Sequence, residues 1–435
     1  MEEEVLELAS KVADQAEVYA ITSEATPVSF EANRLKRLET KETRGLALRL
    51  IKDGRLGFAS TTRLDHPRSL VDSALEVAPF GAEARFEFPA EGTASQVHIY
   101  DPAVADLTVE RMVEMGQGMI DRVRACNPAI LCDVDLRKSV STVTLLNSRG
   151  SHVTYRKTTL SVGLHANLIR GTDMLDVYES VASCHHDVDY AGLVEAILEK
   201  IRLAEKTVPI ATRPMPVIFT PKGVAYTLVL PLQMAFSGKT VLEGASPLGD
   251  KLGQRAFDKR LSLYDDGRVD GAPASAPYDD EGVPTRRSPL IESGVVRSFY
   301  YDLQTAGLAG AQSTGNAARS LNSQPNPSTT SLIFAEGEVS YQDMLADIQE
   351  GLVVDQTMGA WAGNILAGEF SGNVHLGYKV EKGRIVGRVK DTMVTGNVFQ
   401  ALADLAAVGD EAVWVGGKLK VPYLYFRSLS VASKG

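Results

Sequence analysis

The chain has 435 residues, of which 44% are hydrophobic and 23% are charged, and its formal net charge is -10. This size allows two or three domains with a large buried core, and the acidic balance argues against direct contact with nucleic acid. No apolar run reaches the roughly 18 residues of a membrane helix, and the start, Met1-Glu2-Glu3-Glu4, is unlike the basic region of a signal peptide, so we expect a cytoplasmic protein without membrane contact.

The first half of the chain predicts helices combined with antiparallel strands. Residues 2–14 repeat apolar positions at spacings of three and four, which indicates a helix. Strand-like alternation follows, and Asp53-Gly54 between two apolar runs indicates a hairpin. Further expected elements are a helix beginning near Pro67, helices at about 108–125 and 190–206, and a hairpin of strands 139–147 and 152–168.

A proline-rich joint at Pro209, Pro214 and Pro216 marks the expected domain boundary, which gives domains 1–212 and 213–435. Helices and strands come in clusters rather than in strict alternation, which favours an α+β fold with an N-terminal helix and antiparallel-sheet domain and a sheet-rich C-terminal domain. The elements expected after the joint are a strand at 217–220, a helix at 222–236, hairpins turning at 292–294 and 381–383, and helices at about 341–350 and 396–408.

Metal-binding patterns are weak. The histidines form no HExxH or HExxxH, and the three cysteines form no CxxC, which is typical of reduced thiols. The best cluster is Cys184-His185-His186-Asp187 with Asp189. Adjacent side chains on a strand point to opposite faces, and an aspartate suits a helix N-terminus. The cluster therefore indicates a capped strand–helix junction more than a metal site.

Three small polar segments are candidate sites. Asp279-Asp280-Glu281-Gly282 could hold a divalent cation through oxygen ligands, but the same residues suit a tight turn. Ser313-Thr314-Gly315-Asn316 and Phe370-Ser371-Gly372-Asn373 could present main-chain donors to a peptide or anion, or be ordinary turns. The residues alone leave both alternatives open.

Taken in order, these motifs resemble the TldD/PmbA family, long labelled "modulator of DNA gyrase", over nearly the whole chain. The segments that carry the resemblance are Val28–Glu31, Gly45–Thr61, Tyr278–Thr285, Leu290–Val295, Ser313–Ala317, Phe370–Asn373 and Gly377–Gly383.

Within this resemblance, TldD-like members carry HExxxH on the first helix of the C-terminal domain and a cysteine near the C-terminus, which together hold a catalytic zinc. The matching helix here, Lys222–Phe236, has neither histidine nor acidic residue, and Gly416-Gly417-Lys418 stands where the family has Cys-Gly-Lys. Zinc is held in proteins by imidazole, thiolate or carboxylate. The sequence is therefore similar to the TldE/PmbA branch, which lacks the zinc ligands and forms a complex with a TldD-like chain.

The resemblance implies a non-catalytic subunit that contributes to a peptide cleft in a zinc metallopeptidase complex acting on peptides and unfolded proteins. It implies no cofactor in this chain, zinc in a TldD-like partner, and a homodimer when that partner is absent. An exposed sheet edge can hold an extended peptide through its main chain. The candidate cleft residues are Asp279, Asp280, Glu281, Gly282, Ser313, Thr314, Gly315, Asn316, Ser371, Gly372 and Asn373.

Two alternatives remain open at this point. The chain could be a self-sufficient metallopeptidase whose ligands, such as His185, His186 and His375, come together only on folding. It could also be a regulator that binds DNA gyrase or another protein without proteolysis.

Overall fold

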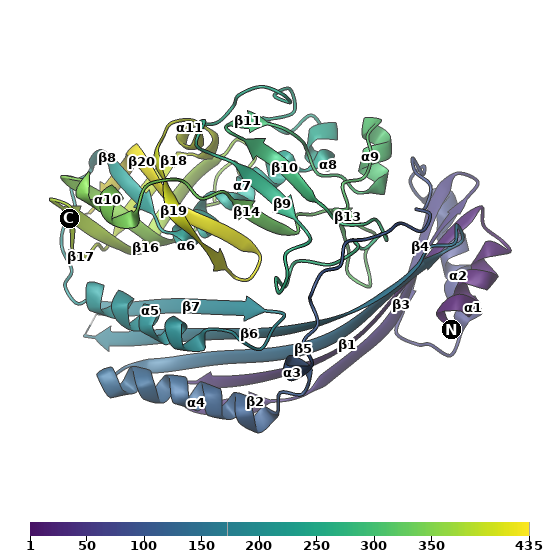
Figure 1. The fold of residues 1–435 in the computed structure, drawn as a ribbon, viewed down its shortest axis with the longest axis horizontal. Coiled ribbons are helices and arrows are strands. Elements are labelled where there is room, and N and C mark those ends of the chain that lie inside the picture. The colour runs from purple at the N-terminus through teal and green to yellow at the C-terminus, as the bar shows by residue number, and fades with distance from the viewer. Residues whose placement is uncertain (172, 435) are drawn as a thin grey trace.

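The computed structural model describes residues 1–171 and 173–434, and in it a long curved sheet from the first half of the chain lies against a sheet-rich body from the second half (Figure 1). The first sheet has the strand order β4-β3-β1-β5-β6-β7, and β2 pairs with the outer part of β1. Its strands are β1 (Gln15–Glu31), β2 (Arg34–Leu38), β3 (Lys41–Lys52), β4 (Arg55–Thr61), β5 (Leu131–Asn147), β6 (His152–Arg170) and β7 (Asp173–Ser183).

Helices cover the first sheet at both ends. Helices α1 and α2 lie at one end of the sheet, and α4 and α5 lie at the other (Figure 1). The helical segments of this half are α1 (Glu2–Ser10), α2 (Pro67–Val77), the 3-10 turn η1 (Ala78–Phe80), α3 (Pro102–Ala105), α4 (Val109–Cys126) and α5 (Tyr190–Leu203).

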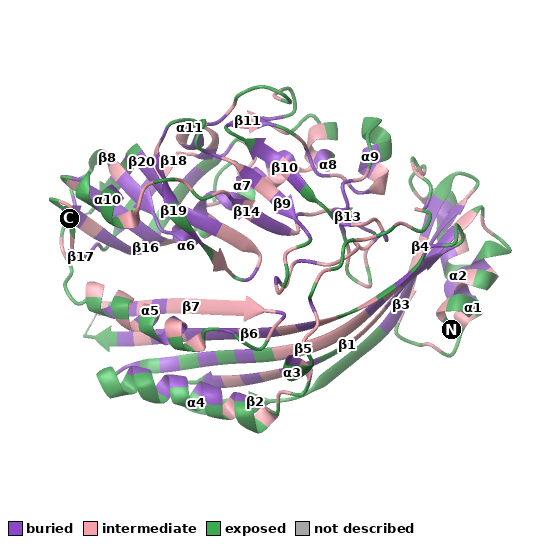
Figure 2. Ribbon diagram, viewed as in Figure 1, coloured by how far each residue is buried: buried purple, intermediate pink, exposed green. Residues whose placement is uncertain are grey.

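Buried and exposed residues alternate along parts of the long strands, so there one face of the first sheet is covered and the other is open. Along the start of β5, Cys132, Val134 and Leu136 are buried while the residues between them are exposed, and Figure 2 shows such alternating bands on the long strands. The buried face packs against α4. At Gly116 of α4, an added Cβ would lie 2.4 Å from the ring of Phe30, so this glycine permits the close approach of helix and sheet.

The second half is built on a larger sheet whose strands partly close on themselves. Strand β8 pairs with β15 on one side and with β20 on the other, so β20, β18, β16, β15 and β8 form a ring. The strands are β8 (Arg213–Phe219), β9 (Leu263–Asp266), β10 (Arg287–Glu292), β11 (Val295–Val296), β12 (Ala317–Ala318), β13 (Asn326–Pro327), β14 (Ser331–Phe334), β15 (Glu350–Met358), β16 (Glu369–Glu381), β17 (Arg384–Arg388), β18 (Thr392–Asn397), β19 (Leu405–Val415) and β20 (Leu419–Ser433).

Helices fill and flank this second body. The helices are α6 (Pro221–Thr227), α7 (Val229–Phe236), α8 (Gly238–Leu242), α9 (Leu303–Ala309), α10 (Tyr341–Ala346) and α11 (Val398–Ala403). Val224 and Leu228 from the α6 region share a core with Phe219 and Phe426 of the sheet. A second core crosses the two halves, because Ile197 of α5 belongs to the same cluster as residues of α10 and β15. The two halves are thus held together by buried apolar surface.

The expected α+β fold with two domains is confirmed, and the boundary at residue 212 stays a prediction. The Asp53-Gly54 hairpin is present, with positive φ at both residues. The helix expected at 2–14 ends at Ser10, and the one expected at 222–236 divides into α6 and α7. The helix expected at 396–408 is wrong in its second part, because residues from Leu405 onward pair with β20. None of the described helices has the length and apolar character of a membrane span.

Candidate functional site

The folded chain brings two of the three predicted loops into direct contact. The backbone N–H of Ala317, which follows Asn316, donates to Asp279 at 3.0 Å. The N–H of Asp280 donates in turn to the carbonyl of Ala317 at 3.1 Å. An added Cβ at Gly315 would lie 2.6 Å from the carbonyl oxygen of Pro284, so the two loops pack at close range. Segments 279–282 and 313–316 therefore form one unit.

The segment 279–282 is a tight turn, in keeping with one of the two interpretations of its sequence. The carboxylate of Asp279 accepts from the N–H groups of Glu281 and Val283 at 3.0 and 2.9 Å, and Gly282 has a φ of 77°. Burial, reinforced by the charge of Glu281, raises the pKa of Asp279 well above its usual value. The Asp279 side chain thus holds the backbone of the turn.

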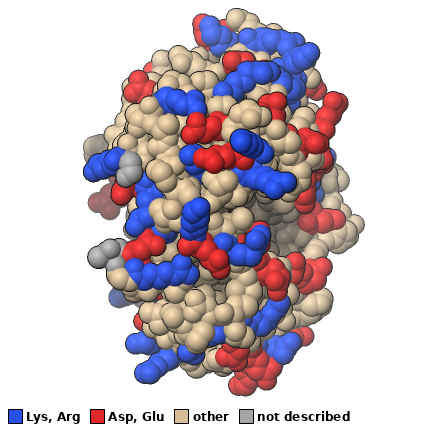
Figure 3. Space-filling model, turned by 90° about the vertical axis from the view of Figure 1, so that its left-hand side faces the viewer, with Lys and Arg blue, Asp and Glu red and all other residues tan. Residues whose placement is uncertain are grey.

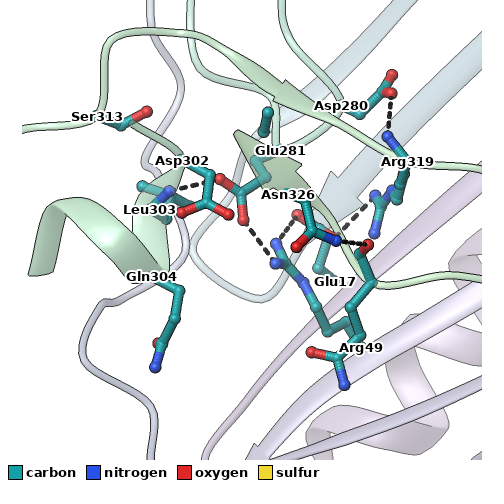
Figure 4. A network of polar contacts seen from close by, with 12 residues as sticks. Glu17, Arg49, Asp280, Glu281, Asp302, Leu303, Gln304, Ser313, Arg319 and Asn326 are labelled. Carbon is teal, nitrogen blue, oxygen red and sulfur yellow. Dashed lines mark hydrogen bonds and ion pairs between the residues drawn. The ribbon is translucent and has the colours of Figure 1, made fainter. Parts of the chain in front are cut away.

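A buried ionic network ties this turn to the N-terminal sheet (Figure 4). Arg49 of β3 donates to Glu281 at 2.6 Å and to Glu17 of β1 at 3.0 Å, and the three side chains are at most 3% exposed. Arg319 pairs with Glu17 at 2.9 Å, and its backbone N–H donates to Asp280 at 2.8 Å. Glu281 therefore connects the two halves directly, whereas Asp280 holds the backbone of Arg319, whose side chain pairs with Glu17 of the first half.

Asn316 lies in a second buried polar cluster. Its amide donates to Asp265 of β9 at 2.6 Å and to the carbonyl of Ser328 at 3.0 Å. Burial raises the pKa of Asp265 to about 6. Burial also lowers the pKa of Lys418, a residue of the Gly-Gly-Lys segment, and the charge of Asp265 opposes that shift. Lys418 is thus within electrostatic reach of the carboxylate that binds Asn316.

The third predicted segment is not a turn. Ser371, Gly372 and Asn373 lie in β16, where they pair with Thr395, Val394 and Met393 of β18. The strand is favoured because Phe370 and Val374 alternate with exposed Ser371 and Asn373. In the part of the chain that the structure describes, no hydrogen bond or ion pair joins these residues to the other two loops.

A cavity that the sequence did not reveal lies between the two halves. It has a volume of about 670 Å³ and is lined by β7 and α5 from the first half and by α6, α10 and several strands from the second half. The face of the molecule on this side is hollowed near its middle, with acidic and basic side chains around the hollow (Figure 3). Such an interdomain cavity is within the usual size range of ligand sites.

Four charged side chains pair with one another in this cavity. Lys200 of α5 binds Asp355 of β15 at 2.7 Å and also binds Glu179 of β7, and Lys222 of α6 lies 3.3 Å from Glu179. Burial alone would lower the pKa of Lys200, but Asp355 and Glu179 outweigh it and raise that pKa. For Lys222 burial prevails over the same carboxylates, and the pKa is lowered.

In helix α6, the helix on which the resemblance would require zinc ligands, the side chains are occupied by other contacts. Thr227 is fully buried, and its hydroxyl lies 2.8 Å from that of Thr357 in β15. The next turn contributes the buried apolar Leu228 and Leu232 to the core. Among residues 1–171 and 173–434, no group of three or more His, Cys, Asp or Glu side chains is placed to hold a metal ion. The described side chains therefore do not form a donor set for zinc.

The histidines singled out in the sequence are paired with carboxylates or separated. His186 Nδ1 lies 2.8 Å from Asp101. His375 of β16 lies 3.3 Å from Asp176 of β7, which His165 also approaches. Asp189 caps α5 by accepting from the N–H of Gly192 at 2.7 Å, as the strand–helix junction interpretation predicted.

Comparison with known proteins agrees with this architecture. Residues 212–433 match the model of the PmbA/TldA metallopeptidase C-terminal domain, and residues 16–78 match that of PmbA/TldA metallopeptidase domain 1. The crystal structure of TldE from Thermococcus kodakarensis is 25% identical, covers 99% of both chains and superposes with a TM-score of 0.91.

Two curated relatives extend over the same length. An uncharacterized protein of Methanocaldococcus jannaschii is 26% identical and covers 98% of each chain. Metalloprotease PmbA of Escherichia coli O157:H7 is also 26% identical, over 93% of this chain and 90% of the relative. Since the C-terminal model alone spans about half of the chain and the likeness continues through the N-terminal sheet, this protein belongs to the PmbA/TldD metallopeptidase family.

Proposed function

We propose that this chain is a non-catalytic subunit of a TldD/TldE-type zinc metallopeptidase complex, in which it forms part of the cleft that holds peptides and unfolded proteins. The zinc would reside in a TldD-like partner, where it would polarise the scissile carbonyl and activate water. The observation that carries the proposal is the interdomain cavity, whose wall is formed by a sheet-edge strand and by α6, the helix that bears Lys222 and Thr227.

The edge strand is β7, the last strand of the N-terminal sheet. Two outward groups on this side are already engaged: the carbonyl of Tyr178, in the middle of β7, accepts from Lys222, and the N–H of Cys184, just after the strand, donates to the carbonyl of Gly271. Peptide groups alternate in direction along a strand, so Ser180 and Ala182 also direct their N–H and C=O groups away from β6. Gly417 packs against Ala182, since a Cβ added to this glycine would lie 3.0 Å from the carbonyl oxygen of Ala182. Among the described residues, the outward groups of Ser180 are therefore the ones that suit pairing with an extended peptide.

The predicted loops would contribute indirectly. Asp279, Asp280 and Glu281 are engaged within the protein, so their part in a cleft would be to fix its walls. Ser371 and Asn373 have exposed side chains on one face of β16 and stay candidates for direct contact. Their assignment as cleft residues stays a prediction.

The first test is to purify the chain alone and together with the TldD-like chain of the same organism. Because a structural or catalytic zinc site requires a full donor set, we expect less than about a tenth of an equivalent of zinc and no cleavage of an unfolded protein by the chain alone. We expect co-elution of the two chains and chelator-sensitive cleavage by the mixture. Stoichiometric zinc with cleavage by the single chain would instead support the self-sufficient metallopeptidase.

A matched pair of variants tests the edge strand. Ser180→Pro removes the outward N–H of this residue without removing a hydrogen bond to β6, whereas Ser180→Ala keeps that N–H. We expect the proline variant to lower cleavage by the assembled complex and the alanine variant to leave it unchanged. Binding of this chain to gyrase without a TldD-like partner, together with no cleavage by the mixture, would favour the regulator alternative.

A further inference from the structure

Several aromatic rings line the cavity, and only some of them stack on another ring of the protein. The aromatic lining residues are Tyr178, Tyr226, Tyr341, Tyr378, Trp414 and Tyr423. Tyr341 stacks on Tyr423 with ring centroids 4.3 Å apart, so these two rings contact each other. Tyr226 is 43% exposed and Trp414 is partly exposed. These two rings offer apolar surface to a ligand in the cavity.

The charges of the cavity are almost completely compensated. Glu179 and Asp355 are paired with Lys200 and Lys222, and Glu199 binds Arg202. The remaining charged lining residue is Arg384, the first residue of β17. It is exposed, and among the described residues its side chain has no ion pair or hydrogen bond. The cavity thus carries one uncompensated guanidinium, a group suited to bidentate binding of carboxylate.

We propose that the cavity is a specificity subsite for a peptide residue with an aromatic or large apolar side chain, and that Arg384 pairs with a carboxylate next to that side chain. Trp414 and Tyr226 contact the apolar part, while the paired charges at Lys200 and Lys222 remain within the protein. The carboxylate comes from the C-terminus of the peptide or from an acidic side chain. The inference rests on the proposed peptide-binding function and adds a preference for the chemical class of the substrate.

Trp414 provides a direct reporter of binding, since the sequence has two tryptophans and Trp361→Phe leaves only this one. The probes are N-acetyl-Ala-Phe as the free acid, the same dipeptide as the amide, N-acetyl-Glu-Phe amide and N-acetyl-Ala-Ala acid. A solvent-accessible charge pair is worth up to about 1 kcal/mol, so the Phe acid should bind about fivefold more tightly than its amide. The Ala-Ala acid should bind more weakly than the Phe acid.

Arg384→Gln should abolish the preference for the acid and leave the affinity for the amide unchanged. Arg427→Gln is the matched control, because Arg427 lines a separate cavity of about 280 Å³ and should leave the preference intact. Tighter binding of the Glu-Phe amide than of both Ala-Phe probes would identify an acidic side chain as the source, and tighter binding of the Phe acid than of both amides would identify the C-terminus. Equal affinities of the Phe acid, the Phe amide and the Glu-Phe amide, a carboxylate preference that survives Arg384→Gln, or no binding of any probe would overturn the proposal.

These measurements use the single chain without a partner or any cleavage step, so their outcome is separable from that of the proposed complex. An acid preference lost in Arg384→Gln, combined with no cleavage by the mixture, would refute the complex and keep the subsite. Cleavage by the mixture without any acid preference would refute the subsite and keep the complex. A thermal melt of each variant verifies that the substitution leaves the fold intact.

Discussion

Replacing Arg49 by methionine should destabilise the protein strongly, because Arg49 is the cation shared by two buried carboxylates. Glu17 and Glu281 lie 3.0 and 2.6 Å from its guanidinium and are at most 1% exposed. Methionine fills part of the same space but leaves Glu281 without its ion-pair partner and Glu17 with Arg319 alone. Removing one partner of a buried ion pair costs about 3–5 kcal/mol. We expect a loss in this range in the free energy of unfolding at pH 8.

The pH dependence of the loss provides a second check. In the Arg49→Met variant the buried carboxylate of Glu281, which has lost its ion-pair partner, takes up a proton more readily in the folded than in the unfolded state. The folded state then binds more protons, so the stability of the variant rises as the pH falls. The difference from the parent should therefore be smaller at pH 5 than at pH 8.

The assay is urea unfolding followed by both tryptophan fluorescence and circular dichroism, whose coincidence tests for a single transition. The control is Arg122→Met, because Arg122 and its partner Glu195 are 49% and 64% exposed. Exposed pairs contribute at most about 1 kcal/mol. A loss at Arg49 no larger than that of the control, or a loss that grows on acidification, would refute the role assigned to the buried network.

Three further outcomes follow from the structure. Burial raises the pKa of Asp265 to about 6, above the value near 3.8 of the unfolded chain, so the folded state binds the proton more tightly and the free energy of unfolding falls as the pH rises from 4 to 6. In Asp265→Asn, urea unfolding should lack this part of the pH dependence. Gly307→Ala should cost about 1–3 kcal/mol, measured by urea unfolding, because the new Cβ would lie 1.8 Å from a backbone carbonyl of the other half of the molecule. Alkylation of the native protein should modify the exposed Cys126 and spare Cys132 and Cys184, because both are buried and burial raises the pKa of their thiols. Mass spectrometry should therefore find one label per chain before unfolding and three after.

Local sequence signals were sufficient for elements whose stability is local. Asp53-Gly54 takes the positive φ of a tight hairpin, and Asp189 caps α5, as short-range rules predict. The segment that begins with the helix-favouring Leu405, Ala406 and Ala407 nevertheless becomes β19, because β20 offers it a pairing partner. The glycine and small polar residues of segment 370–373 are typical of turns, but they also occur on strands whose neighbours pack closely, as Thr357 does against Gly372.

The site was harder to predict because its contacts are distant in sequence. Arg49 and Glu281 are separated by 232 positions, and no pattern near either residue indicates the other. The cavity likewise combines Glu179, Lys200 and Asp355 from three separate elements. The family resemblance directed attention to the helix that contains Lys222, but not to the edge strand that faces it.

The pairing of β1 has a consequence for the order in which the chain can fold during synthesis. The strand β1 has 17 residues and pairs on one side with β2 and β3, which follow it closely. Its other side pairs with β5, which ends only at Asn147, so a ribosome must add more than a hundred residues before that side is covered. A long unpaired edge is a template for association with other chains. During this interval one side of β1 is therefore open to pairing with another chain, and the completion of β5 removes that opportunity.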